Sequence, residues 1–217
     1  MKITVFLADD HAVVRDGLKL LLETQADLLV VGEAADGREA VRRVDQLRPR
    51  VAILDIAMPE LNGIEAAWQI KAARPETQII MLSMYSSLEH IFQALRAGAQ
   101  GYLLKEAAGA EVIQAVRAVH HGKRYLSQKI TDLVIDEYLR QGGGAAGDSP
   151  LTRLAPRERE VLQLVAEGKS TAEIAQILPL SPKTVDTYRS RLLKKLGLRD
   201  LSALIRFALQ HGLIQTE

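Results

Sequence analysis

Three acidic residues stand at the ends of short apolar runs. Asp9 and Asp10 follow the run at 3–8, and Asp55 closes the run at 51–55. Runs of this length and composition are typical of buried parallel strands, and open α/β folds place their chemistry at the carboxyl edge of such strands. The three carboxylates are therefore expected to converge at one edge of a sheet.

Converging carboxylates require a cation. At about 5 Å and an effective dielectric near 20, each pair repels by roughly 3 kcal/mol, which is a large share of the net stability of a domain. Mg²⁺ relieves this repulsion, and it favours sites with one or two carboxylates that waters and phosphate oxygens complete. We therefore expect Mg²⁺ as the cofactor.

A hydroxyl and an ammonium group complete the pattern. Ser83 ends the apolar run at 79–83, and Lys105 follows the run at 101–104. Beside a cation-bound carboxylate these groups predict a phosphoryl site, in which the carboxylate is the nucleophile and the cation and lysine stabilise charge on the transferred oxygens. The chemistry expected at this edge is phosphoryl transfer to a carboxylate.

The elements that must position these residues follow from hydrophobic periodicity. Apolar strand-like runs alternate with amphipathic helical segments, which predicts a parallel sheet with crossover helices. The expected fold is an α/β doubly wound, five-stranded, flavodoxin-like domain over residues 1–122. Its strands are expected near 3–8, 28–34, 51–55, 78–83 and 101–104, and its helices near 12–23, 37–47, 62–74, 87–97 and 109–121.

A linker is expected over residues 123–150. It begins with an amphipathic helix near 127–140 and continues as the glycine-rich stretch 142–150, which is too polar and too flexible to pack. The charge balance differs between the two parts of the chain that this linker joins. Residues 1–149 carry 17 basic and 20 acidic side chains, whereas residues 150–217 carry 11 basic and 7 acidic ones. The two parts are therefore expected to bind different partners.

Composition limits the class of protein. With 217 residues, of which 47% are hydrophobic, the chain is long enough for two small packed domains. It has no cysteine, which excludes disulfides and cysteine-bound metal. Since no apolar run approaches the ~18 residues of a membrane helix, we expect a cytoplasmic protein with no membrane partner.

The last part of the chain, residues 151–217, contains helical patterns and no strand pattern. A short helix at 171–177, a tight turn and a second helix at 183–196 describe a helix-turn-helix in a small all-α domain, whose second helix enters the major groove of DNA. Ser181 is expected to cap that helix and Gly197 to end it. Its polar face, which is expected to meet phosphates and base edges, shows Lys183, Thr184, Asp186, Thr187, Ser190, Arg191, Lys194 and Lys195.

The motifs form two sets, one in each part of the chain. The first comprises Asp9-Asp10, the run 54–59 with Asn62-Gly63, Ser83, and the run 101–105. The second comprises the runs 154–162, 173–175, 180–185 and 194–197. In this order they resemble a two-component response regulator of the NarL/FixJ type, which joins a receiver domain to a LuxR-type DNA-binding domain. The resemblance spans nearly the whole chain.

The resemblance implies that Asp55 accepts a phosphoryl group from a cognate histidine kinase. It also implies that Mg²⁺ is bound directly by Asp10 and Asp55, through water by Asp9, and by the backbone carbonyl of Ala57. These roles come from the family's motifs, residue by residue.

Three further residues have roles that the resemblance implies. Lys105 pairs with the phosphoryl group, Ser83 swings toward it, and Tyr102 rotates inward as a switch. The receiver would catalyse only its own Mg²⁺-dependent phosphorylation and dephosphorylation. The chain is therefore not expected to be an enzyme that acts on external substrates.

For DNA, the resemblance implies that different residues of the second helix read bases and bind phosphates. Because Asp186 would repel phosphates, cytosine N4 is the donor that it would read. Tyr188 stands where many family members carry histidine, and its hydroxyl is expected to contact a phosphate. Ala155 replaces a common threonine. The residues nearest the bases are Asp186, Thr187 and Ser190, and those mostly on phosphates are Lys183, Thr184, Arg191, Lys194 and Lys195.

Phosphorylation is expected to produce a homodimer that reads an inverted repeat in double-stranded DNA. One domain makes few phosphate contacts and binds weakly, whereas two linked domains gain avidity without new contacts. The expected seam is an exposed apolar stripe on the last helix, and packing against the recognition helix is a rival use of part of it. The stripe consists of Leu201, Leu204, Ile205 and Leu209.

Two rival functions are considered. A phosphatase of the haloacid-dehalogenase pattern would carry a second aspartate two residues after the nucleophile, where this chain has Ala57. A phosphate-independent regulator, whose receiver serves only for dimerisation, would usually lack an acid or the lysine, and here all are present. The sequence therefore predicts a phosphorylation-dependent, DNA-binding transcription regulator.

Overall fold

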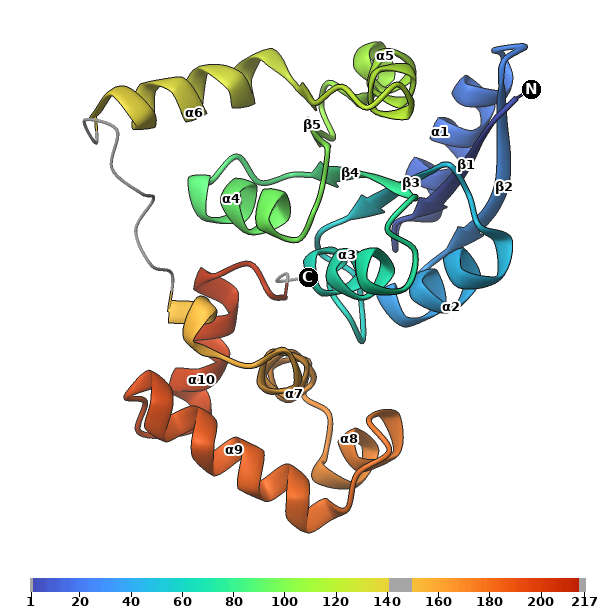
Figure 1. The fold of residues 1–217 in the computed structure, drawn as a ribbon. Helices are drawn as coiled ribbons and strands as arrows, with labels where there is room; N and C mark the ends of the chain where they lie inside the picture. The colour runs from blue at the N-terminus through green and yellow to red at the C-terminus, as the bar shows by residue number, and fades with distance from the viewer. Residues whose placement is uncertain (1, 141–149, 215–217) are drawn as a thin grey trace. The chain divides into compact units, whose positions relative to one another are not determined.

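The computed structural model describes residues 2–140 and 150–214 (Figure 1). The chain divides into two compact units, and among the described residues the first contains the strands and the second the last four α-helices. The glycine-rich stretch predicted at 142–150 lies outside the described residues, apart from Pro150. Within the described ranges, no helix is both long and apolar enough to cross a membrane.

The first unit is built on a parallel sheet in the order β2-β1-β3-β4-β5-β6. This confirms the predicted doubly wound fold, with six strands instead of five. The additional strand, β6 (Tyr125–Leu126), pairs with β5 and is too short to produce a recognisable apolar run. The other strands lie where the sequence predicts them, at β1 (Ile3–Ala8), β2 (Leu28–Ala34), β3 (Val51–Asp55), β4 (Gln78–Ser83) and β5 (Gly101–Leu104).

Helices cover both faces of this sheet (Figure 1). On one face, α1 (Ala12–Glu23) and α5 (Ala108–His120) pack against each other and against the sheet. The other face is covered by α2 (Gly37–Leu47), α3 (Gly63–Ala73) and α4 (Leu88–Arg96). The core beneath α1 and α5 includes Ile3, Val5, Leu7, Leu18, Leu22, Val112, Val116 and Val119.

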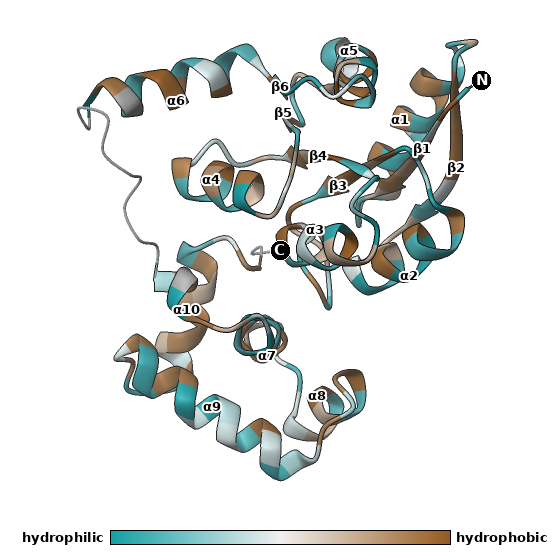
Figure 2. Ribbon diagram, in the orientation of Figure 1, coloured by the Kyte–Doolittle hydropathy of each residue, from teal (hydrophilic) through white to brown (hydrophobic). Residues whose placement is uncertain are grey.

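Capping side chains determine where helices α2 and α3 begin. Asn62 caps α3, because its side chain accepts a hydrogen bond from the Glu65 N–H at 3.0 Å. Asp36 caps α2 in the same way, accepting from the Glu39 N–H at 2.7 Å. Brown and teal segments alternate along these helices in Figure 2, as expected for amphipathic helices with one face in the core.

β6 and α6 (Gln128–Arg140) extend the first unit beyond residue 122. The Tyr125 N–H donates to the Gln100 carbonyl at 2.9 Å, and the Ser127 N–H donates to the Tyr102 carbonyl at 3.1 Å. Ile130 of α6 is fully buried. The helix predicted near 127–140 is therefore present, and its first turn is anchored to the edge of the sheet.

The second unit is helical. It contains a 3₁₀ turn at Pro150–Arg153, then α7 (Pro156–Ala166), α8 (Thr171–Ile177), α9 (Pro182–Leu196) and α10 (Leu201–Gln210). These helices share a core that includes Val161, Ile174, Val185, Leu192 and Leu204.

α8, a tight turn and α9 form the predicted helix-turn-helix. Ser181 starts α9, because its hydroxyl accepts from the Thr184 N–H at 3.1 Å, and Pro182 occupies the first helical position. Gly197 ends the helix in the left-handed region, at φ 66°. The boundaries of the recognition helix are thus determined by local signals.

The prediction that α10 carries an exposed apolar stripe is wrong for Leu204. This side chain is only 2% exposed, because α10 packs on α7 and Leu204 enters the core of the unit. Leu201 is 43% exposed, while Ile205 and Leu209 are half-buried. For Leu204, packing within the domain is therefore the correct interpretation.

A stability prediction follows from Ala155, which stands at the N-cap of α7 without a side-chain acceptor. Its backbone has the extended conformation of a capping residue, with φ −65° and ψ 155°, and its N–H donates to Glu158 Oε2 at 2.9 Å. We expect Ala155→Thr to raise the free energy of unfolding by about 1 kcal/mol, because a hydroxyl would accept an N–H of the first turn.

Chemical denaturation of the full chain measures this change. Ser181→Ala, which removes the existing cap of α9, is the matched variant and should lower the free energy of unfolding by about the same amount. An Ala155→Thr protein no more stable than the parent would contradict the prediction.

Candidate functional site

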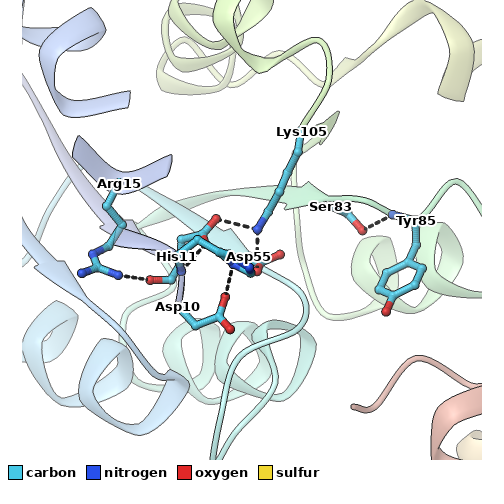
Figure 3. A network of polar contacts seen from close by, with 8 residues as sticks. Asp10, His11, Arg15, Asp55, Ser83, Tyr85 and Lys105 are labelled. Carbon is cyan, nitrogen blue, oxygen red and sulfur yellow. Dashed lines mark hydrogen bonds and ion pairs between the residues drawn. The ribbon is translucent and has the colours of Figure 1, made fainter. Parts of the chain in front are cut away.

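The three carboxylates meet at the carboxyl edge of the sheet, as predicted. Asp55 is the last residue of β3, and Asp9 and Asp10 follow β1, its neighbour in the sheet. Asp55 and Asp9 are only 1% and 2% exposed, whereas the Asp10 side chain is 31% exposed. Figure 3 shows Asp10 and Asp55 close together at this edge. The cluster is therefore buried on one side and open to solvent at Asp10.

Lys105 reaches into the cluster from the end of β5. Its Nζ lies 2.8 Å from Asp55 Oδ2 and 2.8 Å from Asp9 Oδ2. Figure 3 shows the Lys105 side chain extending toward Asp55. Burial disfavours the charged ammonium, but the two carboxylates outweigh burial and raise the pKa of Lys105. Lys105 therefore remains a cation that bridges two acids.

The donor set fits Mg²⁺. One ligand atom from each of Asp9, Asp10, His11 and Asp55 lies within 4.8 Å of the others. Burial, and then the charge of Asp9, raise the pKa of Asp55 to about 7, even though Lys105 opposes the shift. The cluster also holds three carboxyl groups, those of Asp9, Asp10 and Asp55, against the single ammonium of Lys105. A hard divalent cation that prefers carboxylate oxygens corrects this imbalance.

Two residues close to the acids support the loop that carries them: His11, which directly follows the acid pair in the sequence, and Arg15, which the sequence patterns did not identify. His11 Nδ1 lies 2.6 Å from Asp10 Oδ1, and the His11 N–H donates to Asp9 Oδ1 at 2.9 Å. Arg15, one turn into α1, donates from Nη1 to the Asp9 carbonyl at 2.5 Å. Both hold the loop that carries the acid pair. For His11, the position directly after that pair is the signal in the sequence.

Ser83 and Tyr102 are both fully buried, and both contact Tyr85. The Tyr85 N–H donates to Ser83 Oγ at 2.9 Å, as Figure 3 shows, and the Tyr102 hydroxyl donates to the Tyr85 carbonyl at 2.8 Å. Burial raises the pKa of Tyr102, and a hydrogen bond from Ser83 only partly offsets that rise. In this structure the Tyr102 ring lies in the interior of the receiver-like unit. The sequence patterns did not identify Tyr85.

Gly63 sets the position of the loop that follows Asp55. The Gly63 N–H donates to the Ile56 carbonyl at 2.8 Å. A Cβ at Gly63 would lie 2.0 Å from the Asp55 carbonyl oxygen, so only glycine fits without a backbone shift. Ala57, whose carbonyl is the expected metal ligand, is buried in the same loop.

The recognition helix α9 presents a polar stripe opposite its core face. Lys183, Thr187 and Lys194 follow the spacing of one helix face and are exposed, whereas Val185 and Leu192 are buried. The remaining exposed members of the stripe are Ser190 and Arg191. Five of the predicted DNA-contacting residues thus share one solvent-facing surface.

The other four predicted DNA-contacting residues lie beside this stripe, and each contacts other parts of the domain, although Asp186 and Lys195 are exposed. Lys195 Nζ pairs with the buried Glu158 at 2.7 Å, and Tyr188 packs against the core. Asp186 Oδ1 accepts from Thr171 Oγ1 at 3.3 Å, and Thr184 Oγ1 lies 2.8 Å from the Ser181 hydroxyl. The Lys195 ammonium therefore pairs with Glu158 in this structure while its side chain stays 45% exposed.

Two protein-family models match the chain, one in each unit. Residues 5–117 match the response regulator receiver domain, and residues 152–208 match the luxR family of bacterial regulatory proteins. A similar full-length protein is the oxygen regulatory protein NreC of Staphylococcus carnosus. It is 40% identical over 213 residues, which cover 97% of this chain and 98% of that protein.

Solved structures give the same picture. The response regulator RcsB of Salmonella typhimurium, in one solved structure, is 31% identical, with 95% of this chain and 97% of that chain covered and a TM-score of 0.59. In a structure of the RcsB–DNA complex, the protein is 30% identical, with 95% and 98% covered and a TM-score of 0.59. In both cases the similarity extends over the receiver-like and the helical parts.

Proposed function

Because this chain belongs to the response regulators that join a receiver domain to a LuxR-type DNA-binding domain, we propose that Asp55 accepts a phosphoryl group from a histidine kinase and that this phosphorylation controls transcription. One observation carries the proposal. The buried Asp55 carboxylate stands at a strand end, 2.8 Å from the Lys105 ammonium and within the acidic cluster. We place the receiver at 1–122, the linker at 123–150 and the DNA-binding domain at 151–217.

Phosphoryl transfer assigns a role to each group at this edge. When bound, Mg²⁺ supplies positive charge for the phosphoryl oxygens, and it would be held by Asp10, Asp55 and the Ala57 carbonyl, with Asp9 acting through water. A carboxylate oxygen of Asp55 forms the new O–P bond as the P–N bond of the donor phosphohistidine breaks, and the electron pair stays on the imidazole. Lys105, already in contact with Asp55, neutralises the incoming oxygens.

The buried hydroxyls connect this chemistry to the rest of the receiver. Ser83 is one strand away from Asp55, at the end of β4, and its hydroxyl turns toward the new phosphoryl oxygens in the proposed active state. That movement changes its hydrogen bond with the Tyr85 N–H, and the Tyr85 carbonyl in turn bonds the Tyr102 hydroxyl. A charge change at Asp55 thereby reaches the surface formed by α4 and β5.

Binding to DNA is assigned to the exposed stripe of α9. Lys194 is expected to contact a phosphate, and Thr187 is expected to face the bases. Lys194→Ala should therefore weaken binding to all duplexes alike and lower the slope of log affinity against log salt by about 1. Thr187→Ala should instead alter base preference with little change in that slope. Fluorescence anisotropy at several salt concentrations measures both, and a sequence-dependent loss in Lys194→Ala would contradict the assignment.

The proposed regulation is tested by comparing the oligomeric state and DNA affinity with and without phosphodonor. We expect acetyl phosphate with Mg²⁺ to convert monomer to dimer in sedimentation experiments. We also expect it to tighten binding to a two-fold site by about 10²-fold, because the second domain then binds from the same complex. The DNA is a duplex selected from random sequence by the phosphorylated protein, and its single half-site is the control. A phosphorylated monomer that binds both duplexes equally well would refute regulation by dimerisation.

A further inference from the structure

Two hydrogen bonds join the buried hydroxyls of Ser83 and Tyr102 to the backbone of Tyr85. The Tyr85 N–H donates to Ser83 Oγ at 2.9 Å, and the Tyr102 hydroxyl donates to the Tyr85 carbonyl at 2.8 Å. Both hydroxyls therefore bond the backbone of one residue, Tyr85. Any movement of Tyr85 changes the positions of both buried hydroxyls together.

The Tyr85 side chain is held by His90 of α4. The two rings stack with centroids 4.9 Å apart and planes inclined by 16°. His90 is itself 5% exposed, so its imidazole is a packed part of the fold. A stacked pair of this kind restricts the ring of the loop residue and, through that ring, its backbone.

The orientation of the His90 ring is determined by the start of α4. Ser87 caps this helix, since its Oγ accepts from the His90 N–H, and the same Oγ lies 2.5 Å from His90 Nδ1. Ser87 Oγ and His90 Nδ1 share a hydrogen bond whose donor is set by the tautomer of the ring. The imidazole is therefore fixed by a hydrogen bond on one side and by the Tyr85 ring on its face.

Resting on the phosphorylation of Asp55 proposed above, we propose that His90 is a positioning residue for that reaction: it holds Tyr85 so that Ser83 and Tyr102 are placed before the phosphoryl group arrives. His90 belongs to no motif of the sequence. It acts through Tyr85 and does not itself contact the reacting atoms. The charge of Asp55 contributes to the raised pKa of the Tyr85 phenol, after burial, which agrees with a position of Tyr85 near the acids.

The chain offers variants that separate the two contacts of His90. His90→Phe keeps an aromatic ring for the stack and removes the Nδ1 hydrogen bond. His90→Asn keeps a polar atom near the position of Nδ1 and removes the ring. Ser87→Ala removes the hydroxyl alone. If the stack positions Tyr85, His90→Phe should behave like the parent and His90→Asn should not.

The first measurement needs no phosphorylation. The chain has five tyrosines, so fluorotyrosine labelling gives few resonances, which single Tyr→Phe changes assign. In the full chain without phosphodonor, His90→Asn should shift the fluorine resonances of both Tyr85 and Tyr102, and His90→Phe should leave that of Tyr102 near its parent position. Unchanged resonances in His90→Asn would overturn the proposal, whatever the result for Asp55.

The second measurement is the rate at which phosphoramidate with Mg²⁺ phosphorylates Asp55. We expect a fall of about tenfold in His90→Asn, because misplacing Ser83 costs orientation, and a change within about twofold in His90→Phe. Thermal melting identifies variants that lose folding, and Ser87→Ala then serves as the milder substitute. Equal rates in all variants, or equal losses in both His90 variants, would overturn the role of the stack. A parent protein that is never phosphorylated would instead refute the proposed function, while the fluorine shifts would still report on His90.

Discussion

An Asp55→Asn protein is expected to lose phosphorylation completely. The parent should gain a single adduct of about 80 Da when treated with acetyl phosphate or phosphoramidate and Mg²⁺. The amide of asparagine is nearly isosteric with the carboxylate, but it cannot act as the nucleophile that forms the acyl phosphate. Intact-protein mass spectrometry with and without Mg²⁺ measures the adduct.

The matched control for this change is Asp16→Asn, which neutralises an acid on α1 outside the cluster. It should be labelled like the parent. An Asp55→Asn protein that acquires the same adduct would show that another residue is the acceptor. Release of phosphate from p-nitrophenyl phosphate over many turnovers would favour the phosphatase alternative, and DNA binding that is indifferent to Asp55 would favour the phosphate-independent regulator.

Gly63→Ala is expected to damage both stability and phosphorylation. The new Cβ would lie 2.0 Å from the Asp55 carbonyl oxygen and 2.9 Å from its carbonyl carbon, so the backbone that carries Asp55 must move. We expect a loss of about 3 kcal/mol in the free energy of unfolding, at the upper end for overpacking, because the obstacle is main chain and not a flexible side chain. The rate of phosphorylation should fall by at least about tenfold through the displacement of Asp55.

A second glycine, Gly17, provides a control in which the same substitution should raise the free energy of unfolding instead of lowering it. A Cβ at Gly17, in the middle of α1, would meet no atom within 4 Å, and its φ is not in the left-handed region. Gly17→Ala should therefore raise the free energy of unfolding by about 0.8 kcal/mol, through the higher helix propensity of alanine. Urea denaturation compares the two proteins. If Gly63→Ala were as stable as the parent, the loop after Asp55 would not be held as the structure shows.

Much of the candidate site follows from local sequence. Asp55 and Ser83 end apolar runs, and Asp9, Asp10 and Lys105 directly follow such runs. Since the carboxyl ends of parallel strands share one edge, their convergence could be predicted. The recognition helix could be delimited for the same kind of reason, because Ser181 and Gly197 act on the backbone within a turn of their own position.

The sequence could not predict which side chains would be engaged by distant partners. Lys195 was predicted only as a phosphate-binding residue, and in the fold its ammonium also pairs with the buried Glu158, which lies 37 positions earlier. Leu204 has the spacing of the exposed apolar stripe that was predicted to form the dimer interface, but α10 packs on α7 and buries this side chain. Periodicity shows which residues share a face, whereas only packing shows what covers that face.

The sequence by itself determined the succession of strands and helices along the chain, the acids at the sheet edge and the helix-turn-helix. These features follow from strand ends, helix caps and hydrophobic periodicity, which depend on only a few neighbouring residues. Only the tertiary structure revealed three features: the two-residue strand β6, the close approach of the Asp55 carbonyl that allows only glycine at position 63, and the stacking of His90 on Tyr85. These features depend on atoms brought together from different elements. Their energies arise from close contact and burial, which no local pattern encodes.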